Sequence, residues 1–297
     1  MPKSSYKHYR RRTGDRIDGR LLRSLSGFQL FTPYIMPTRN DALNYFSENV
    51  EITEADRWLR QQRVNGYKGM GFLHVLIAAY VRSISKYPGM NRFIAGRHIF
   101  ARNDIEVVMT VKKTMDMEAP DTTIKVHFSP SDTVYDVYRK VNEQVDSVKD
   151  NAEDNGTDRF ANTMKKLPRP IFRFIIWVLK IMDYFGWIPQ DLLEVSPFHG
   201  SMVITDLGSL GVKPVFHHIY NFGTVPVFLA FGAKRKAYEV TRTGTVVKNK
   251  YMDFNITLDE RICDGYYMAN AVKAFKSFVA DPTSLEIPPE EVNEDVF

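Results

Sequence analysis

Residues 258–265 read Leu-Asp-Glu-Arg-Ile-Cys-Asp-Gly and stand between two apolar segments of different periodicity. Residues 251–258 before them have the composition of a strand. Residues 266–279 after them place Met268, Val272 and Phe275 on one face of a helix, which Pro282 ends. The stretch is therefore predicted to connect a core strand to a core helix.

Working outward, the rest of the chain alternates between strand and helix patterns. Helices are predicted over 54–63, 71–86 and 132–149, with Thr53 and Ser131 as N-caps of the first and third. Residues 149–163 are polar and are expected to form a surface loop. Further strands are predicted over 44–53, 99–100, 105–111, 123–128, 200–205 and 225–232.

The composition bounds the class of protein. The chain has 297 residues, of which 44% are hydrophobic and 25% are charged, and these values exclude a disordered or collagen-like chain. Its single cysteine, Cys263, excludes an intrachain disulfide, and no apolar leader follows Met1. A cytoplasmic location is the expectation.

Charge is distributed unevenly along the chain. The formal net charge is +5, and residues 1–23 carry eight basic and two acidic side chains. A basic arm is expected over 1–20 and a solvated acidic tail over 286–297. Neither a zinc-finger spacing nor an RNA-recognition signature accompanies the basic residues, so nucleic-acid binding is not expected.

Residues 170–189 form the most apolar stretch. Arg173, Lys180 and Asp183 interrupt it, whereas a membrane span needs roughly 20 mostly apolar residues. We interpret it as a helix buried between subunits. The alternative is peripheral membrane contact by a helix that lies in the plane of the headgroups, which the aromatic content would suit.

Several motifs carry a resemblance to a known family. Residues 259–265 resemble the Asp-His-Arg-x-x-Asp-Gly signature of the dihydrolipoyl acyltransferase catalytic domain of 2-oxoacid dehydrogenase complexes, and residues 263–265 are also similar to chloramphenicol acetyltransferase. Residues 87–91 and 203–211 resemble two further family segments, in the same order. The resemblance runs from about residue 20 to residue 285 and is interrupted by an apolar insert at about 165–193.

The resemblance implies a fold and a reaction. The fold would be a chloramphenicol acetyltransferase-like α/β (α+β) domain over 21–285, with a mixed sheet flanked by helices. The family is implied to form homotrimers, or larger assemblies, whose active sites lie at subunit boundaries and bind coenzyme A and an acyl carrier. No lipoyl domain is visible in this chain, so an acyl carrier would act in trans.

Residue roles follow from the same resemblance, position by position. Thr205 matches the family's oxyanion-stabilising hydroxyl donor, and Asp264 matches its structural aspartate. Arg261 matches the arginine of the signature, and Asn221 precedes the strand that follows the Thr205 segment. Glu260 occupies the position of the histidine that accepts the thiol proton.

The replacement of this histidine by Glu260 is the main departure from the family pattern. A carboxylate ordinarily has a pKa of about 4.3 and a thiol one of about 8.5, so proton transfer between them is uphill by about 6 kcal/mol. Strand alternation predicts that Glu260 and Arg261 point to opposite faces. Two interpretations follow: an oligomeric scaffold or coenzyme A-binding protein without conventional catalysis, or an acyltransferase with Glu260 or His218 as the base.

Other chemistries find less support in the sequence. No His, Cys and carboxylate positions show metal-site spacing, so no metal is expected. Cys263 is expected to be a small buried side chain, since the neighbouring Asp264 would raise the pKa of its thiol.

Overall fold

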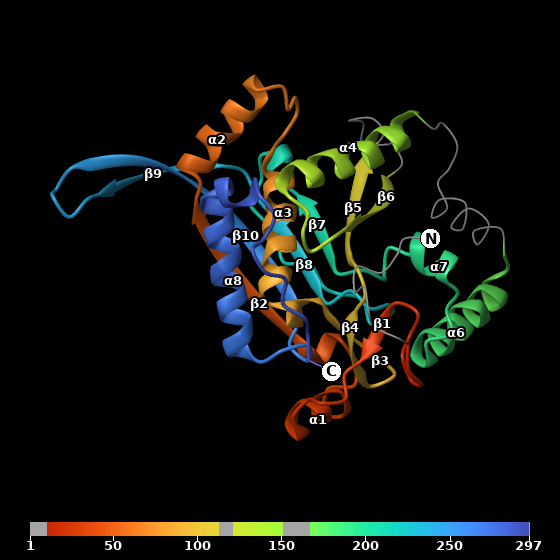
Figure 1. Ribbon diagram of the computed structural model, residues 1–297. Coiled ribbons are helices and arrows are strands. Elements are labelled where there is room, and N and C mark those ends of the chain that lie inside the picture. The colour runs from red at the N-terminus through yellow and green to blue at the C-terminus, as the bar shows by residue number, and fades with distance from the viewer. Residues whose placement is uncertain (1–10, 113–120, 151–166, 297) are drawn as a thin grey trace.

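The computed structural model describes residues 11–112, 121–150 and 167–296. A mixed seven-stranded sheet lies at its centre, in the order β2-β10-β8-β7-β5-β6, with β9 paired to β10 (Figure 1). The strands are β2 (Leu43–Glu51), β5 (Ile105–Lys112), β6 (Asp121–Phe128), β7 (Met202–Asp206), β8 (Val227–Phe231), β9 (Arg235–Val240) and β10 (Val246–Asp259). β7 runs parallel to β5 and β8, and the other pairs are antiparallel. The predicted mixed sheet flanked by helices is confirmed.

Some helices pack on one face of this sheet, and others lie at the periphery of the molecule (Figure 1). They are α1 (Gly27–Ile35), α2 (Thr53–Val64), α3 (Phe72–Lys86), α4 (Val134–Asp150), α6 (Arg169–Phe185), α7 (Gln190–Val195) and α8 (Gly265–Ala280). Short 3-10 turns occupy Asn40–Ala42, Pro88–Asn91, Gly208–Leu210 and Pro282–Leu285. The apolar insert thus forms α6 and α7. None of the described helices combines the length and apolarity needed to cross a membrane.

The long strand β10 organises the core. Its alternating residues Met252, Phe254, Ile256 and Leu258 are buried in the cluster that α3 and α8 close. The rings of Phe254 and Phe275 on α8 meet edge to face, with centroids 5.5 Å apart. The same alternation leaves Asp259 on the face of the sheet that α3 and α8 do not cover.

A second, three-stranded sheet ties the two ends of the described chain together. It has the order β1-β4-β3, with β1 (Gly19–Leu21), β3 (Arg92–Ala95) and β4 (His98–Arg102). Arg92 on β3 binds the carboxylate of Asp295 through two bonds of 2.6 and 2.7 Å, and both side chains are buried. Arg20 on β1 donates to the backbone oxygens of Asp295 and Val296.

The described ends are therefore solvated only in part: residues 11–14 and 290–294 are exposed, whereas Asp15, Arg16, Arg20 and Asp295 are buried. Burying an arginine requires a partner, and Asp295 and Val296 supply partners for Arg20 and Arg92. The first ten residues of the basic arm lie outside the described residues, as does most of the loop expected over 149–163.

Some sequence expectations differ in detail. Ile52, rather than Thr53, is the N-cap of α2, and the hydroxyl of Thr53 instead accepts from the backbone N–H of Lys250. Thr133, rather than Ser131, exchanges capping bonds with Asp136 at the start of α4. The sequence did not predict β1 and β3, which are short. It also did not predict β9 and α1, which carry apolar side chains that are exposed.

The core position of Phe254 yields a stability prediction. Its side chain is 0% exposed, so Phe254→Ala is expected to lower the free energy of unfolding by about 3–5 kcal/mol, since it leaves a cavity between β10 and α8. Tyr238→Ala on the exposed hairpin of β9 is the matched control, with an expected change within about 0.5 kcal/mol. Urea unfolding followed by circular dichroism measures both, and equal losses would contradict the assignment of the core.

Candidate functional site

The predicted connection between strand and helix forms a tight turn. β10 ends at Asp259, and the backbone N–H of Ile262 donates to the carbonyl of Asp259. Asp264 then caps α8, because its Oδ1 accepts from the backbone N–H of Tyr267 at 2.9 Å. Residues 259–264 are thus fixed between a core strand and a core helix.

The carboxylate of Asp259 is fully buried and binds two guanidinium groups. Arg261 donates from Nε at 2.8 Å and from Nη2 at 2.7 Å, and Arg39 approaches with its Nε at 3.3 Å. Arg261 also donates to the carbonyl of Met36. Such charge-assisted, two-pronged contacts fix orientation as well as position. Burial lowers the pKa of Arg39, although the charge of Asp259 works in the opposite direction.

Arg39 connects this turn to the loop that contains the predicted Asn221. Its two terminal nitrogens donate to the carbonyls of Tyr220 and Gly223 at 2.6 and 2.9 Å. Gly223 has φ of +88°, and a Cβ there would lie 2.1 Å from the carbonyl oxygen of Phe198, so the position requires glycine. Asn221 accepts from the backbone N–H of Asn40 through its Oδ1 at 3.0 Å.

Glu260 is half-buried and lies apart from Arg261. Its Oε2 accepts from the side-chain amide of Asn44 on β2 at 2.8 Å, and its backbone N–H donates to the carbonyl of Ala42. The expectation that Glu260 and Arg261 diverge thus agrees with their contacts. Strand alternation is not the cause of this divergence, however, because both residues stand in a turn. The guanidinium of Arg261 is instead held in place by the carboxylate of Asp259.

The structure does not bring Thr205 and Glu260 together within one chain. Thr205 on β7 pairs with Ala230 on the neighbouring strand β8. Asp259, the residue before Glu260, instead donates its backbone N–H to the carbonyl of Pro226. Pro226 and Ala230 are four residues apart, which corresponds to roughly 13 Å along a strand. His218 is exposed, and its ring contacts Tyr220, with centroids 5.1 Å apart.

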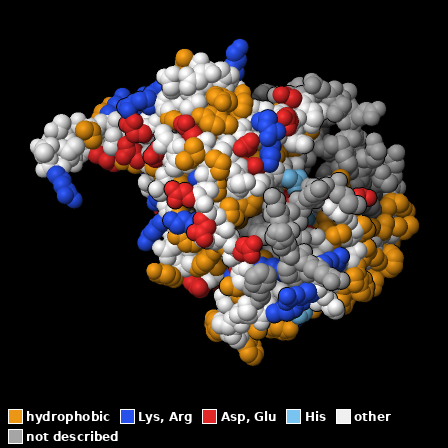
Figure 2. All heavy atoms as spheres, in the orientation of Figure 1, with side chains coloured by type: hydrophobic (Ala, Val, Ile, Leu, Met, Phe, Trp, Pro, Cys, Tyr) orange, Lys and Arg blue, Asp and Glu red, His pale blue; other side chains and the backbone are white. Residues whose placement is uncertain are grey.

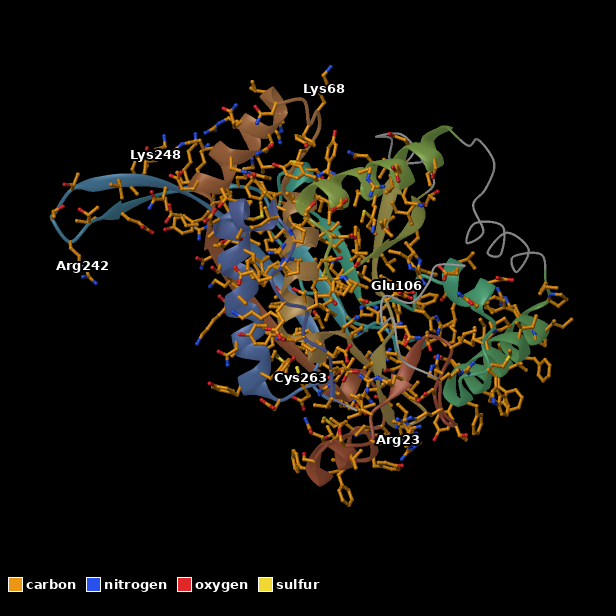
Figure 3. All side chains as sticks on the ribbon, viewed as in Figure 1. Arg23, Lys68, Glu106, Arg242, Lys248 and Cys263 are labelled. Atoms are coloured by element: carbon orange, nitrogen blue, oxygen red, sulfur yellow. The ribbon has the colours of Figure 1, made fainter. Side chains whose placement is uncertain are left out.

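Cys263 is buried, as expected from the sequence (Figure 3). Its Sγ lies 3.8 Å from the sulfur of Met90. Burial is the main cause that raises the pKa of the thiol to about 12, and the nearby Arg92 only partly opposes it. A thiol in this setting is not a nucleophile near neutral pH.

A basic cavity of about 320 Å³ lies behind the turn. The ends of α1 and α6, the β3–β4 turn, residues 221–223 and Arg261 line it. Arg97 lies in that turn with φ of +62°, next to Gly96, and its guanidinium stands over the ring of Tyr34 at 5.7 Å. Among the described residues, no carboxylate pairs with Arg97 or with Lys180, which also lines the cavity.

Asp183 on α6 anchors a buried polar network that the sequence reading missed. Its Oδ1 meets Arg16 and the Nε2 of His199, each at 3.2 Å, and its Oδ2 accepts from the backbone N–H of Gly223. Arg16 in turn binds Asp18 at 2.8 Å. The sequence does contain one indication of this network, because an acidic residue inside an apolar helix needs a buried partner. The sequence could not say which residue that partner would be.

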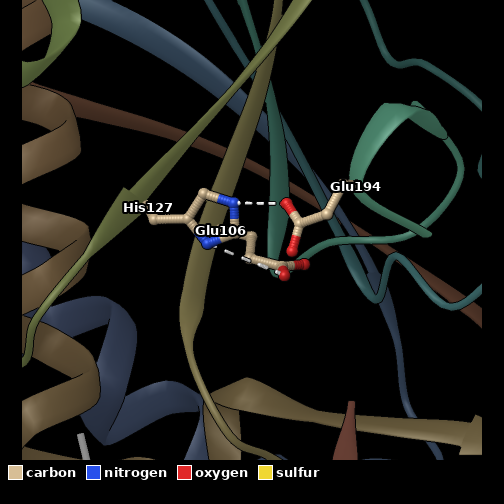
Figure 4. A group of neighbouring side chains, drawn as sticks. All are labelled: Glu106, His127 and Glu194. Atoms are coloured by element: carbon tan, nitrogen blue, oxygen red, sulfur yellow. Dashed lines mark hydrogen bonds and ion pairs between the residues drawn. The ribbon is translucent and has the colours of Figure 1, made fainter. Parts of the chain in front are cut away.

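Three titratable side chains from β5, β6 and α7 form a second cluster (Figure 4). His127 lies between two carboxylates, with Nε2 2.9 Å from Glu194 and Nδ1 3.9 Å from Glu106. Their ligand atoms lie within 4.8 Å of one another, a geometry that a metal ion could use. Arg102 and Lys125, however, stand 3.7 and 4.0 Å from Glu106 and already compensate its charge. The sequence reading missed this cluster because its members are far apart in the chain.

The contacts of Asp259 yield a second prediction. Asp259→Asn leaves two buried guanidinium groups without their counter-charge, so the free energy of unfolding is expected to fall by about 3–5 kcal/mol. Asp253→Asn, on the same strand, removes only a partly exposed pair with Arg235 and is expected to cost less than about 1 kcal/mol. Urea unfolding at neutral pH compares the two variants, and a small loss for Asp259→Asn would contradict this view of the turn.

Asp183 yields a prediction about pH. Burial alone would raise the pKa of its carboxyl, but His199 and Arg16 lower it from 3.8 to about 2. The unfolded carboxyl then binds a proton more tightly than the folded one, so its contribution of about 2 kcal/mol is present above pH 4 and is lost as the pH falls from about 4 to 2. The wild type should therefore lose its stability advantage over Asp183→Asn across this window in urea unfolding. A constant difference between the two proteins would show that this carboxyl is not linked to folding.

Comparison with known proteins concerns the fold and one segment of the sequence. Residues 190–287 match the family model of the 2-oxoacid dehydrogenases acyltransferase (catalytic domain). A probable dihydrolipoamide acetyltransferase from Listeria monocytogenes 4b F2365 has a TM-score of 0.54 at 13% identity, over 93% of this chain and 97% of that chain. No curated protein sequence matches the chain.

Two further solved structures have the same fold. The cubic core of a pyruvate dehydrogenase multienzyme complex has a TM-score of 0.52 at 14% identity, over 87% of this chain and 88% of that chain. A chloramphenicol acetyltransferase has a TM-score of 0.51 at 11% identity, over 85% and 94%. The chain thus has the fold of chloramphenicol acetyltransferase and the dihydrolipoamide acetyltransferases, and its residues 190–287 carry the sequence match to the acyltransferase catalytic domain of 2-oxoacid dehydrogenases.

Proposed function

We propose that the protein is a coenzyme A-dependent acyltransferase-like protein that lacks conventional histidine-based transfer and serves as an oligomeric scaffold or as a binding protein for coenzyme A or acyl groups. The observation that carries the proposal is Glu260, which stands in the signature turn and is held by the amide of Asn44. The surrounding turn is intact: Asp259 binds Arg261, and Asp264 caps α8.

The chemistry explains why this position matters. In thioester exchange, a base removes the thiol proton, the thiolate attacks the carbonyl carbon, and the oxyanion that forms needs a donor. The carbonyl then re-forms as the other thiolate leaves and takes the proton back. A carboxylate in place of the imidazole faces a transfer that is uphill by about 6 kcal/mol with ordinary pKa values.

The positive charge of the cavity is complementary to the negatively charged phosphate groups of coenzyme A. Arg97 and Lys180 line it without a carboxylate partner among the described residues, and they would hold a phosphate group. Arg39 and Arg261 line it as well, but Asp259 already engages both. The bound coenzyme would supply the thiol or the thioester.

The separation of the predicted site residues supports a homotrimer or a larger assembly. Thr205 and Glu260 stand at different levels of one sheet, so they could face one substrate only across a subunit boundary. One similar structure is the core of a multienzyme complex. In this proposal the protein is cytoplasmic, and an acyl carrier, if it takes part, acts in trans.

The second candidate is an active acyltransferase with Glu260 or His218 as the base and Thr205 as the oxyanion donor. The hydrogen bond from Asn44 favours Glu260 within this candidate, because it orients the carboxylate at the base position. His218 has no comparable contact among the described residues; its ring meets Tyr220.

One experiment separates the two candidates. The protein is incubated with acetyl-coenzyme A and dihydrolipoamide, and the release of free coenzyme A is followed for the wild type, Glu260→Gln and His218→Ala. We expect all three rates to equal the background, because no imidazole stands at the base position. Coenzyme A should still bind in equilibrium dialysis, and Arg97→Gln combined with Lys180→Gln should weaken it by about ten-fold.

The opposite results are equally clear. A wild-type rate well above background that Glu260→Gln or His218→Ala abolishes would establish the active enzyme and end the scaffold proposal. Failure of the wild type to bind coenzyme A would remove the ligand from the proposal.

A further inference from the structure

The outward face of α6 is apolar and carries large aromatic side chains. Phe174, Trp177 and Phe185 are 62, 58 and 57% exposed, and Trp187 just beyond the helix is 63% exposed. Their spacing along α6, together with that of the exposed Ile171, places them on one broad side of the helix. Figure 2 shows hydrophobic side chains gathered along the edge of the molecule where Figure 1 places α6.

A basic stripe flanks this apolar face. Arg169, Arg173 and Lys180 are exposed, and their spacing of four and seven residues aligns them along one side of α6. The helix has one acidic residue, Asp183, which is buried and bound to Arg16 and His199. The charge that α6 presents to its surroundings is therefore entirely positive.

We propose that α6 docks on an anionic membrane surface, where it lies in the plane of the headgroups with its aromatic side chains inserted. The helix cannot span a bilayer, but an apolar face with Trp and Phe beside a row of Lys or Arg is the pattern of an interfacial helix. The aromatic rings suit the headgroup boundary, and the basic stripe suits anionic lipid phosphates.

A second copy of the chain that docks through a two-fold contact is a less favourable occupant of this face. A two-fold contact between two α6 helices would place the basic stripe of one copy against that of the other, with no exposed acidic residue on the helix to compensate. An anionic surface meets both features at once.

Helix α1 carries a separate exposed apolar surface. Phe28, Phe31 and Ile35 are among its exposed side chains, and α1 carries no charged residue. The ends of α1 and α6 border the same basic cavity.

Co-sedimentation with vesicles tests the proposal on the full chain. We expect the wild type to pellet with vesicles of phosphatidylcholine and phosphatidylserine, more weakly with phosphatidylcholine alone, and less as salt rises. Phe174→Ser combined with Trp177→Ser should lower the partition coefficient at least about ten-fold, since two aromatic anchors are lost. Arg169→Gln combined with Arg173→Gln should lower it about ten-fold on the anionic vesicles and little on phosphatidylcholine alone.

The matched control lies on the exposed hairpin of β9. Tyr238→Ser combined with Val240→Ser removes apolar side chains that are 70 and 72% exposed, and vesicle binding should not change. Three results would each overturn the proposal: a wild type that does not pellet, α6 variants that bind as well as the wild type, or a lower oligomeric mass of the Phe174 and Trp177 variant in light scattering. A lower oligomeric mass would show that the apolar face of α6 is an interface between subunits.

Discussion

The buried carboxylate of Asp259 fixes the geometry of one end of the sheet. It holds Arg261 and Arg39, and these two guanidinium groups in turn bind the backbone carbonyls of Met36, Tyr220 and Gly223. Three segments that are distant in the sequence therefore converge on one side chain. Because none of these bonds involves the side chain of Glu260, they do not depend on which side chain stands at position 260. A change of the base can thus alter the chemistry and leave the fold intact.

The same constraint extends from the turn to α6. Gly223 accepts from Arg39 through its carbonyl and donates to Asp183 through its N–H. Asp183 binds Arg16, and Arg16 binds Asp18. Such buried pairs add little net stability over apolar packing, but breaking one is costly, so they fix relative positions. The orientation of α6 is therefore set by the site at the end of β10, and not by apolar packing alone.

The elements that the sequence predicted well are those with strong periodicity. α3 and α8 show apolar residues at helical spacing, and the core half of β10 has the composition of a strand, so their positions follow from burial. Strands β1 and β3 span three and four residues, too few for a pattern to be distinguished. The projecting hairpin of β9 and β10 has Arg242 at its tip and Lys248 midway along it (Figure 3). It is exposed on most of its surface, so its sequence shows no pattern of burial.

The site could be predicted only in its local part. The roles of Asp264 as a helix cap and of Cys263 as a buried thiol follow from their neighbours. The partners of Asp259 and Asp183 include side chains from distant elements, since Arg39 lies 220 positions from Asp259 and Arg16 lies 167 positions from Asp183. Glu106, His127 and Glu194 likewise come from three different elements. Pairing at such separations depends on the topology of the sheet, which no local pattern contains. The prediction of the Glu260 position relied on the order of several motifs.

The contact of Arg20 and Arg92 with residues 295–296 also bears on how the molecule is made. These arginines belong to the small sheet, which consists of early segments of the chain. The carboxylate that pairs with Arg92 leaves the ribosome some two hundred residues after it, so the nascent chain holds the Arg92 guanidinium without this counter-charge. This small sheet, which is built from residues 19–102, is therefore among the last parts of the molecule whose charged groups all find their partners.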